Sequence, residues 1–301
     1  MTRPIRRVVV AGVTGFIGGA VAAAFAASDA SVACWSRTAR QGATQVDYTD
    51  VDALAQRLRE ARPDLLVMAA GAADVRGASE SPIRDYQAAV EPWVNTLNAV
   101  LKSGRSPQVI LISSGAVFGQ PAHLPVCEAT PRQPISPYGY HRYLCELLAQ
   151  EFADCFNMDV RVARVFSTYG PRQQRLLVWE LAKQLLEGHD HLVLRGTGLE
   201  QRDYLHVDDL AARIVSLANH EGATSMTVNL ASGRSVTTGE LAECLLAVAG
   251  MSRRIVYQNQ AQLGNPDVWA VDVEPMKAIH PEPARELEAG LAQCWSTWSM
   301  S

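Results

Sequence analysis

Residues 136–143 read SPYGYHRY, and they place Tyr138 four positions before Arg142, directly after a proline. Proline is favoured in the first turn of a helix, and residues four apart on a helix lie on one face. A tyrosine hydroxyl can give or take a proton, and a neighbouring cation stabilises the phenolate. The spacing therefore predicts that the two residues form an acid/base couple.

A hydroxyl that could act with this couple comes earlier, in the run QVILISSG at 108–115. Its apolar part predicts a buried strand that ends in Ser113 and Ser114. A serine hydroxyl can bind a substrate oxygen while a tyrosine transfers a proton to or from that oxygen. Taken alone, a serine in a turn and a tyrosine on a helix are more often structural. Their order after a glycine-rich turn favours Ser114, Tyr138 and Arg142 as catalytic residues.

That glycine-rich turn, GVTGFIG, follows the first apolar run and precedes a helix of small residues. Glycine allows a tight turn and lets backbone N–H groups approach a pyrophosphate at the helix N-terminus. Strand, glycine turn and helix in this order predict a dinucleotide site. The predicted contacts are Gly12, Gly15, Phe16, Ile17 and Gly18 in the turn, and Ala69, Ala70 and Gly71 at the end of the run DLLVMAAG.

The end of the second expected strand indicates which dinucleotide binds. An NAD ribose is usually bound there by Asp or Glu, but this chain has Ser36 and Arg37, followed by Arg40. A hydroxyl and guanidinium groups suit a 2′-phosphate, so we expect NADP, with NAD as the alternative. The other interpretation is that these arginines are solvated loop charges. Asp47 could accept a hydrogen bond from the adenine amino group or could simply form a turn.

Apolar, β-rich runs alternate with helical patterns through the first half of the chain, as expected for parallel strands buried on both faces. The sequence therefore predicts an α/β fold: a Rossmann-type doubly wound parallel sheet at 1–165 and a smaller C-terminal substrate domain at 166–301. Residues 205–220 are expected to pack back on the first domain. The expected strands are 6–12, 31–35, 64–71, 108–115 and 160–167, with shorter strands at 191–196, 227–232 and 253–258 in the second domain.

Composition excludes several classes of protein. Hydrophobic residues make up 48% of the chain and the formal net charge is −4, with no basic cluster, so we expect no nucleic-acid partner. Six scattered cysteines without a C-x-x-C motif indicate reduced thiols and a cytoplasmic location.

Glycine and threonine interrupt an N-terminal stretch that resembles a signal peptide, and no run reaches the roughly 18 apolar residues of a membrane span. We expect no metal, because HVDD at 206–209 suits a helix start and GHDH at 188–191 a solvated turn.

Seven motifs in a fixed order carry a family resemblance, and they span nearly the whole chain. The sequence resembles the extended branch of the short-chain dehydrogenases/reductases, NAD(P)-dependent epimerases and dehydratases that act mainly on nucleotide sugars. By this resemblance Ser114 is a ligand of the substrate oxygen, Tyr138 the catalytic acid/base and Arg202 a ligand of the substrate diphosphate. The motifs are GVTGFIG, DLLVMAAG, LISSGAVFG, SPYGYHR, RVFSTYGPRQ, QRDYLHVDDLA and VNLASGRSVTTGELA.

The chain departs from the family pattern in three ways. Arg142 stands where the family has a lysine that bonds the nicotinamide ribose, and the two cations are not interchangeable. Ser167 stands where the family often has Asn, and an Arg expected near QLGNPD is missing, so Arg202 and Arg172 or Arg175 are left to bind substrate phosphate. Phe118 replaces a common tyrosine and removes a hydroxyl near the sugar.

These observations lead to an NADPH-dependent reductase of a 4-keto nucleotide sugar as the first hypothesis. A nucleotide-sugar epimerase with tightly bound NAD is the main alternative. A dehydratase is less favoured, because Gly115 and Ala116 stand where that group needs an acidic pair. A reductase of a non-nucleotide ketone and a catalytically degenerate NAD(P)-binding protein also stay open. Because family members pair the helices at 85–102 and 138–155, we expect a homodimer.

Overall fold

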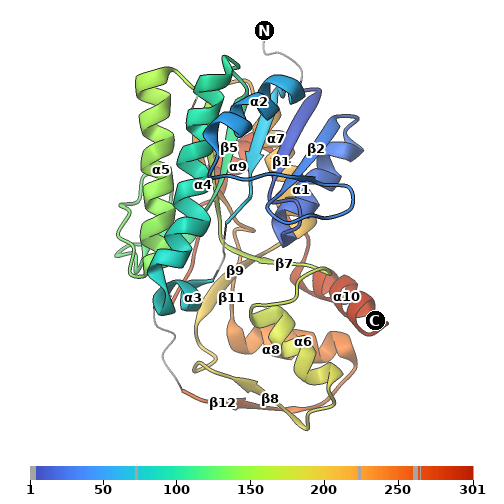
Figure 1. Cartoon of the computed structure of the whole chain (residues 1–301). Coiled ribbons are helices and arrows are strands. Elements are labelled where there is room, and N and C mark those ends of the chain that lie inside the picture. Colours follow the sequence, from blue (N-terminus) through green and yellow to red (C-terminus); the bar gives the residue numbers. More distant parts are fainter. Residues whose placement is uncertain (1–4, 72–73, 223–224, 260–263, 265, 301) are drawn as a thin grey trace.

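The computed structural model describes residues 5–71, 74–222, 225–259, 264 and 266–300. Within these ranges a seven-stranded parallel sheet (Figure 1) has the order β10-β6-β5-β4-β1-β2-β3. The order reverses between β1 and β4, and doubly wound sheets bind ligands beside such a reversal. The strands are β1 (Arg7–Ala11), β2 (Ser31–Ser36), β3 (Thr44–Gln45), β4 (Leu65–Met68), β5 (Gln108–Ser114), β6 (Val160–Val165) and β10 (Thr227–Leu230).

Helices cover both faces of the main sheet, which confirms the predicted doubly wound α/β fold. Along β1, Val8 and Val10 face one helical layer and Val9 faces the other, and all three are at most 1% exposed. A strand buried on both faces reads as a continuous apolar run, as this one does. One layer holds α1 (Phe16–Ala27), α7 (Val207–Asn219) and α9 (Glu274–Ile279), and the other holds α2 (Val51–Ala61), α4 (Pro82–Ser103) and α5 (Pro137–Phe156).

A second lobe, drawn below the main sheet in Figure 1, has its own apolar core and two small sheets. Its helices are α6 (Leu177–Leu186), α8 (Thr238–Ala249) and α10 (Leu287–Trp298), and its strands are β7 (Ser167–Tyr169), β8 (His191–Leu194), β9 (Gln201–His206), β11 (Ser235–Thr237) and β12 (Arg254–Tyr257). Two short elements complete the chain, α3 (Val75–Glu80) and the 3₁₀ turn η1 (Gly115–Phe118). None of the helices in the described ranges is long and apolar enough to cross a membrane.

Segments from the second half of the chain return to the main sheet. We expected the strand at 227–232 in the smaller domain, but β10 pairs with β6, because Val228 and Leu230 complete the core shared with α1. Helix α7 also packs against α1. The division of the chain at residue 165 stays a prediction.

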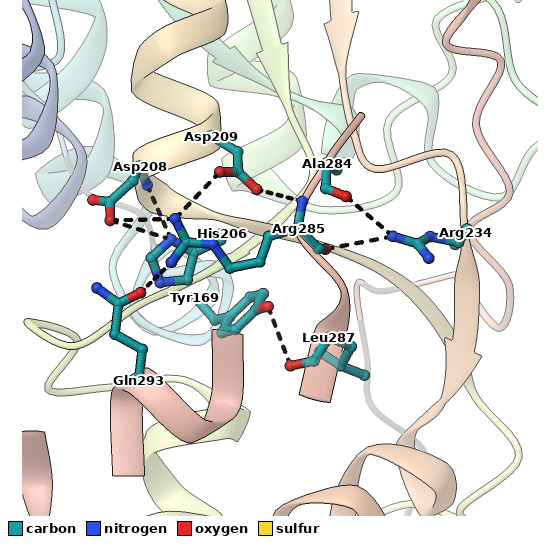
Figure 2. Close-up of polar contacts among 9 residues, drawn as sticks. All are labelled: Tyr169, His206, Asp208, Asp209, Arg234, Ala284, Arg285, Leu287 and Gln293. Carbon is teal, nitrogen blue, oxygen red and sulfur yellow. Dashed lines mark hydrogen bonds and ion pairs between the residues drawn. The ribbon is translucent and has the colours of Figure 1, made fainter. Parts of the chain in front are cut away.

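The junction between α7 and the segment before α10 is polar (Figure 2). The backbone N–H of Arg285 donates to Asp209 at 2.8 Å, and its guanidinium lies 3.9 Å from Asp208 and 3.7 Å from Asp209. The cap of α7 is His206, whose Nδ1 accepts a hydrogen bond from the N–H of Asp208 at 3.3 Å. The motif HVDD therefore lies at the start of α7, as expected. The N-cap of this helix is His206 rather than one of the two aspartates.

Acid should weaken this junction through His206. Burial and then the nearby Arg285 lower the pKa of His206, while Asp208 and Asp209 oppose that shift. The unfolded chain therefore takes up a proton near pH 6.5 that the folded chain takes up only at lower pH. The stability is complete above about pH 6.5 and falls below it, by at most roughly 1.4 kcal/mol per pH unit.

Thermal melting between pH 5 and pH 8 checks this expectation. We expect His206→Asn, which keeps a capping oxygen, to lose less stability on acidification than the unmodified chain. The matched control is His123→Asn, because His123 is exposed. Equal acid dependence in the unmodified chain and the His206 variant would contradict the assignment.

Candidate active site

Ser114 and Tyr138 line one cavity of about 480 Å³, the Ser114 cavity. Ser114 ends β5, and its Oγ accepts a hydrogen bond from the N–H of Ala116 at 3.2 Å. Tyr138 lies in the first turn of α5, where the cap Ser136 accepts from the N–H of Gly139 at 3.2 Å. A Cβ on Gly139 would lie 2.6 Å from the carbonyl oxygen of Ala116, so α5 packs directly on the turn after Ser114. This close packing brings both residues to one cavity.

Arg142 lies one turn after Tyr138 and is only 6% exposed. Its guanidinium carbon is 5.1 Å from the centre of the Tyr138 ring, which makes a cation–π contact. Burial opposes its charge, but Tyr138, Cys145 and Asp85 hold the pKa of Arg142 above its usual value. Gly71 has φ +138°, and a Cβ there would lie 2.8 Å from Arg142 Nη2. The side chain of Arg142 therefore stays positively charged, and it lies between the Tyr138 ring and the loop after β4.

Glu146, one further turn along α5, joins the helix to two strands. Its Oε1 accepts hydrogen bonds from Ser113 Oγ at 2.6 Å and from Arg164 Nε at 3.0 Å, and its Oε2 accepts from Arg164 Nη2 at 2.9 Å. The guanidinium carbon of Arg164 also lies 4.9 Å from the centre of the Phe118 ring. Phe118 is fully buried there, beside Trp269. The network fixes the position of β5 relative to α5 immediately before Ser114.

The glycine turn has the close backbone packing that a dinucleotide site requires. Gly12 has φ +86°, and a Cβ there would lie 2.6 Å from the backbone nitrogen of Ala70. A Cβ on Gly18 would lie 2.3 Å from the carbonyl oxygen of Gly12. Gly15 is the N-cap of α1, and Phe16 and Ile17 are the first two residues of this helix. Ala69 and Gly71 flank Ala70 in the loop after β4. Side chains at Gly12 and Gly18 would collide with neighbouring backbone, so glycine lets this turn pack closely on the loop after β4 and on α1. Such a tight turn at a helix N-terminus fits a dinucleotide.

Residues at the end of β2 lie beside this turn. Ser36 is 2% exposed, and its Oγ lies 3.5 Å from Thr14 Oγ1 and 3.4 Å from Thr38 Oγ1. Arg37 is exposed, whereas Arg40 lines a second cavity of about 610 Å³ together with Gly15 and Phe16. This second cavity is called the Arg172 cavity below, because Arg172 also lines it.

Asp47 makes a local turn. Its Oδ1 accepts hydrogen bonds from the N–H of Thr49 at 2.9 Å and from Thr49 Oγ1 at 2.7 Å. These bonds hold the pKa of Asp47 below its usual value. The turn-forming interpretation accounts for this geometry, and the adenine contact stays a prediction.

The predicted substrate ligands fall into two places. Ser167 and Arg202 line the Ser114 cavity, and Arg202 Nη1 donates to the carbonyl oxygens of Gln201 at 2.7 Å and Asp267 at 3.2 Å. Burial lowers the pKa of Arg202. Arg172 does not line this cavity within the described residues.

Sequence reasoning missed other residues that line the Ser114 cavity. Arg76 and Arg195 add cations to that of Arg202, and Asp74 and Glu180 add carboxylates. Tyr204, Thr238 and Trp269 add polar and aromatic surface. The signal for Arg195 was its place near the end of the strand expected at 191–196, and in the structure it is the first residue beyond β8. Nothing local marked Trp269, which lies in an irregular part of the chain between β12 and α9.

The fold joins a doubly wound parallel sheet with a glycine turn, and it brings Ser114 and Tyr138 to one cavity. A family model, the NAD dependent epimerase/dehydratase family, matches residues 8–231. The chain belongs to this family of enzymes, which confirms the resemblance found in the sequence.

Relatives within the family carry different activities. A GDP-6-deoxy-D-mannose reductase from Pseudomonas aeruginosa is 29% identical over 260 residues, which are 83% of each chain. A putative UDP-glucose 4-epimerase from Methanocaldococcus jannaschii is 24% identical over 249 residues, 81% of this chain and 80% of the relative. The fold is also that of a UDP-glucose 4-epimerase from Thermotoga maritima, solved with UDP-glucose, with TM-score 0.90, 24% identity and coverage of 97% and 98%.

Proposed function

We propose that this chain is an NADPH-dependent reductase of a 4-keto nucleotide sugar. The observation that carries the proposal is the end of β2, where no acidic residue occurs from Ser36 to Arg40. A carboxylate there would bind the ribose of NAD and repel a 2′-phosphate, whereas hydroxyl and guanidinium groups favour NADP. A reductant that is exchanged in every turnover is typically NADPH. The structure of RMD from Pseudomonas aeruginosa, complexed with NADPH, is 25% identical with TM-score 0.85 and coverage of 98% and 100%.

The residues of the Ser114 cavity divide the remaining chemistry between them. Bound NADPH supplies a hydride to the carbonyl carbon of the sugar. The hydroxyl of Tyr138 donates the proton that the carbonyl oxygen needs, and the hydroxyl of Ser114 donates a hydrogen bond that orients the same oxygen. Arg142, in contact with the tyrosine ring, stabilises the phenolate that is left.

Two arginines make the cavity suitable for a nucleotide substrate. Arg195 and Arg202 line the same cavity as Ser114, and guanidinium groups bind phosphate oxygens in pairs. Ser167 lies at the start of β7 on the same cavity and offers a hydroxyl where the family often offers an amide. In this proposal Arg195 and Arg202 bind the diphosphate, while Ser114 and Tyr138 act on the sugar.

The second candidate is a nucleotide-sugar epimerase that keeps NAD bound. The similarity to the two UDP-glucose 4-epimerases favours it. An epimerase oxidises and then reduces its substrate, so it uses the same tyrosine and serine but does not exchange its cofactor.

The first experiment denatures the purified protein and measures any dinucleotide released. We expect little NAD, and we expect the intact protein to bind NADPH at least about tenfold more tightly than NADH. It should then oxidise NADPH when a nucleoside diphosphate 4-keto-6-deoxyhexose is added. Near-stoichiometric NAD would overturn the reductase and establish the epimerase as the better proposal.

Two wider alternatives have separate tests. Failure of every nucleoside diphosphate to raise the melting temperature would favour a ketone substrate without a nucleotide. Failure of both NADPH and NADH to bind would favour a degenerate module. The common cavity of Ser114 and Tyr138 argues against such a module.

We also propose that the chain forms a homodimer through α4 and α5. Helix α5 exposes Tyr140, Leu144 and Leu147, which are 57%, 40% and 45% exposed and lie on one side of the helix. A second copy of the same two helices could cover this apolar surface, and sedimentation of the purified protein would show whether it does. The cytoplasmic location stays a prediction.

A further inference from the structure

The lining of the Arg172 cavity carries positive charge. It is lined by the glycine turn, by the loop 40–43, by the segment 171–174 and by Trp179 and Trp298. Arg40 and Arg172 both lie at its wall, and none of its lining residues within the described ranges is acidic. Two cations that share a cavity without an acidic group favour binding of an anion.

The structure holds Arg172 against helix α1. A Cβ on Gly19 would lie 3.3 Å from both terminal nitrogens of the Arg172 guanidinium, so glycine makes room for it. The segment that carries Arg172 is anchored on both sides. Trp298 Nε1 donates to the carbonyl oxygen of Pro171 at 2.6 Å, and the N–H of Gln173 donates to that of Gly170 at 3.0 Å.

The N-terminus of α1 adds to the positive potential in this cavity. Its cap, Gly15, offers no side-chain hydrogen bond, and the first turn has no acidic residue. Helix α2, in contrast, is capped by the carboxylate of Asp50 and has Asp52 in its first turn. The positive end of the α1 dipole therefore faces the same side as the two arginines without local neutralisation.

We propose that Arg172, together with Arg40, binds the adenosine 2′-phosphate of NADP(H) and so determines the preference for NADP over NAD. This inference rests on the proposed function, and it assigns Arg172 to the cofactor rather than to the substrate. In doubly wound folds the adenosine ribose lies at the end of β2, and Arg40 opens the turn that follows this strand. The dinucleotide diphosphate is bound by the N–H groups of α1, as is usual for this turn. The 2′-phosphate brings about two further negative charges, which the arginines neutralise.

Binding measurements with free cofactors test this assignment without any substrate. Titration calorimetry of the whole protein compares NADP⁺, NAD⁺ and 2′-AMP for the unmodified chain, Arg172→Gln and Arg172→Lys. We expect Arg172→Gln to weaken NADP⁺ and 2′-AMP by about tenfold or more and to change NAD⁺ less than twofold. Arg172→Lys should recover part of the loss, because it restores the charge but not the paired geometry. The matched control is Arg175→Gln, since Arg175 is exposed nearby and lines neither cavity within the described residues.

Each other outcome overturns the assignment in its own way. An equal loss for NADP⁺ and NAD⁺ would make Arg172 a diphosphate ligand. Weaker binding of a nucleoside diphosphate, with unchanged NADP⁺, would return Arg172 to the substrate. An unmodified chain that prefers NAD⁺ would overturn the proposed function as well, whereas preference for NADP⁺ that survives Arg172→Gln would overturn only the role of Arg172.

Discussion

Replacing Tyr138 by phenylalanine should lower kcat by about 10²- to 10⁴-fold, the usual contribution of a general acid. The variant keeps the ring that contacts Arg142 and removes only the hydroxyl of a residue that lines the Ser114 cavity. Binding of NADPH and of a nucleoside diphosphate should therefore change little. Steady-state rates of NADPH oxidation, with the 4-keto sugar at saturation, measure the effect.

The control for this prediction lies on the same helix. Tyr140→Phe removes a hydroxyl from a tyrosine that is 57% exposed, so kcat should stay within about twofold of the unmodified chain. If Tyr138→Phe behaved like this control, another group would be the acid. The chain would then have a mechanism that the family resemblance does not imply.

Local sequence patterns predicted the parts of the site that depend on short-range spacing. Tyr138 and Arg142 are neighbours because one helix turn separates them, and Gly12 was recognisable because its turn needs positive φ. The expected strand at 64–71 ends earlier, at Met68, because Ala69, Ala70 and Gly71 form the loop beside the glycine turn. Elements fixed by local rules were thus predicted to within a few residues.

Long-range packing determined what the sequence could not reveal. Arg172 lies within the family motif RVFSTYGPRQ and was expected to bind the substrate, but the packing of its guanidinium on Gly19 puts it in the other cavity. The return of β10 to the main sheet also depends on a partner distant in sequence, β6. Such pairings have no periodic signal, because each partner alone has an ordinary local pattern.

The network of Glu146 with Ser113 and Arg164 also joins residues distant in the sequence. We expect it to contribute more to the free energy of unfolding than any other group of contacts at the site. Glu146 and Arg164 are 5% and 1% exposed, so removing one partner leaves the other charge buried. We expect Glu146→Gln and Arg164→Met each to lower the free energy of unfolding by about 3–5 kcal/mol. The double variant should cost clearly less than the sum of the two, because no unpaired charge stays behind. Urea unfolding of the four proteins measures these differences.

Glu151→Gln provides the comparison, because Glu151 is an exposed carboxylate on the same helix and should change stability by no more than about 0.5 kcal/mol. Additive costs of Glu146→Gln and Arg164→Met would contradict a coupled pair. Non-additive changes in the free energy of unfolding would show that Glu146 and Arg164 act as one ion pair. Burying such a pair has a desolvation penalty, so we infer that its role is to hold β5 and α5 in one relative position. Since Ser113 donates to the same carboxylate and precedes Ser114, the pair would then fix the position of Ser114 relative to Tyr138, the two residues proposed to act on the substrate.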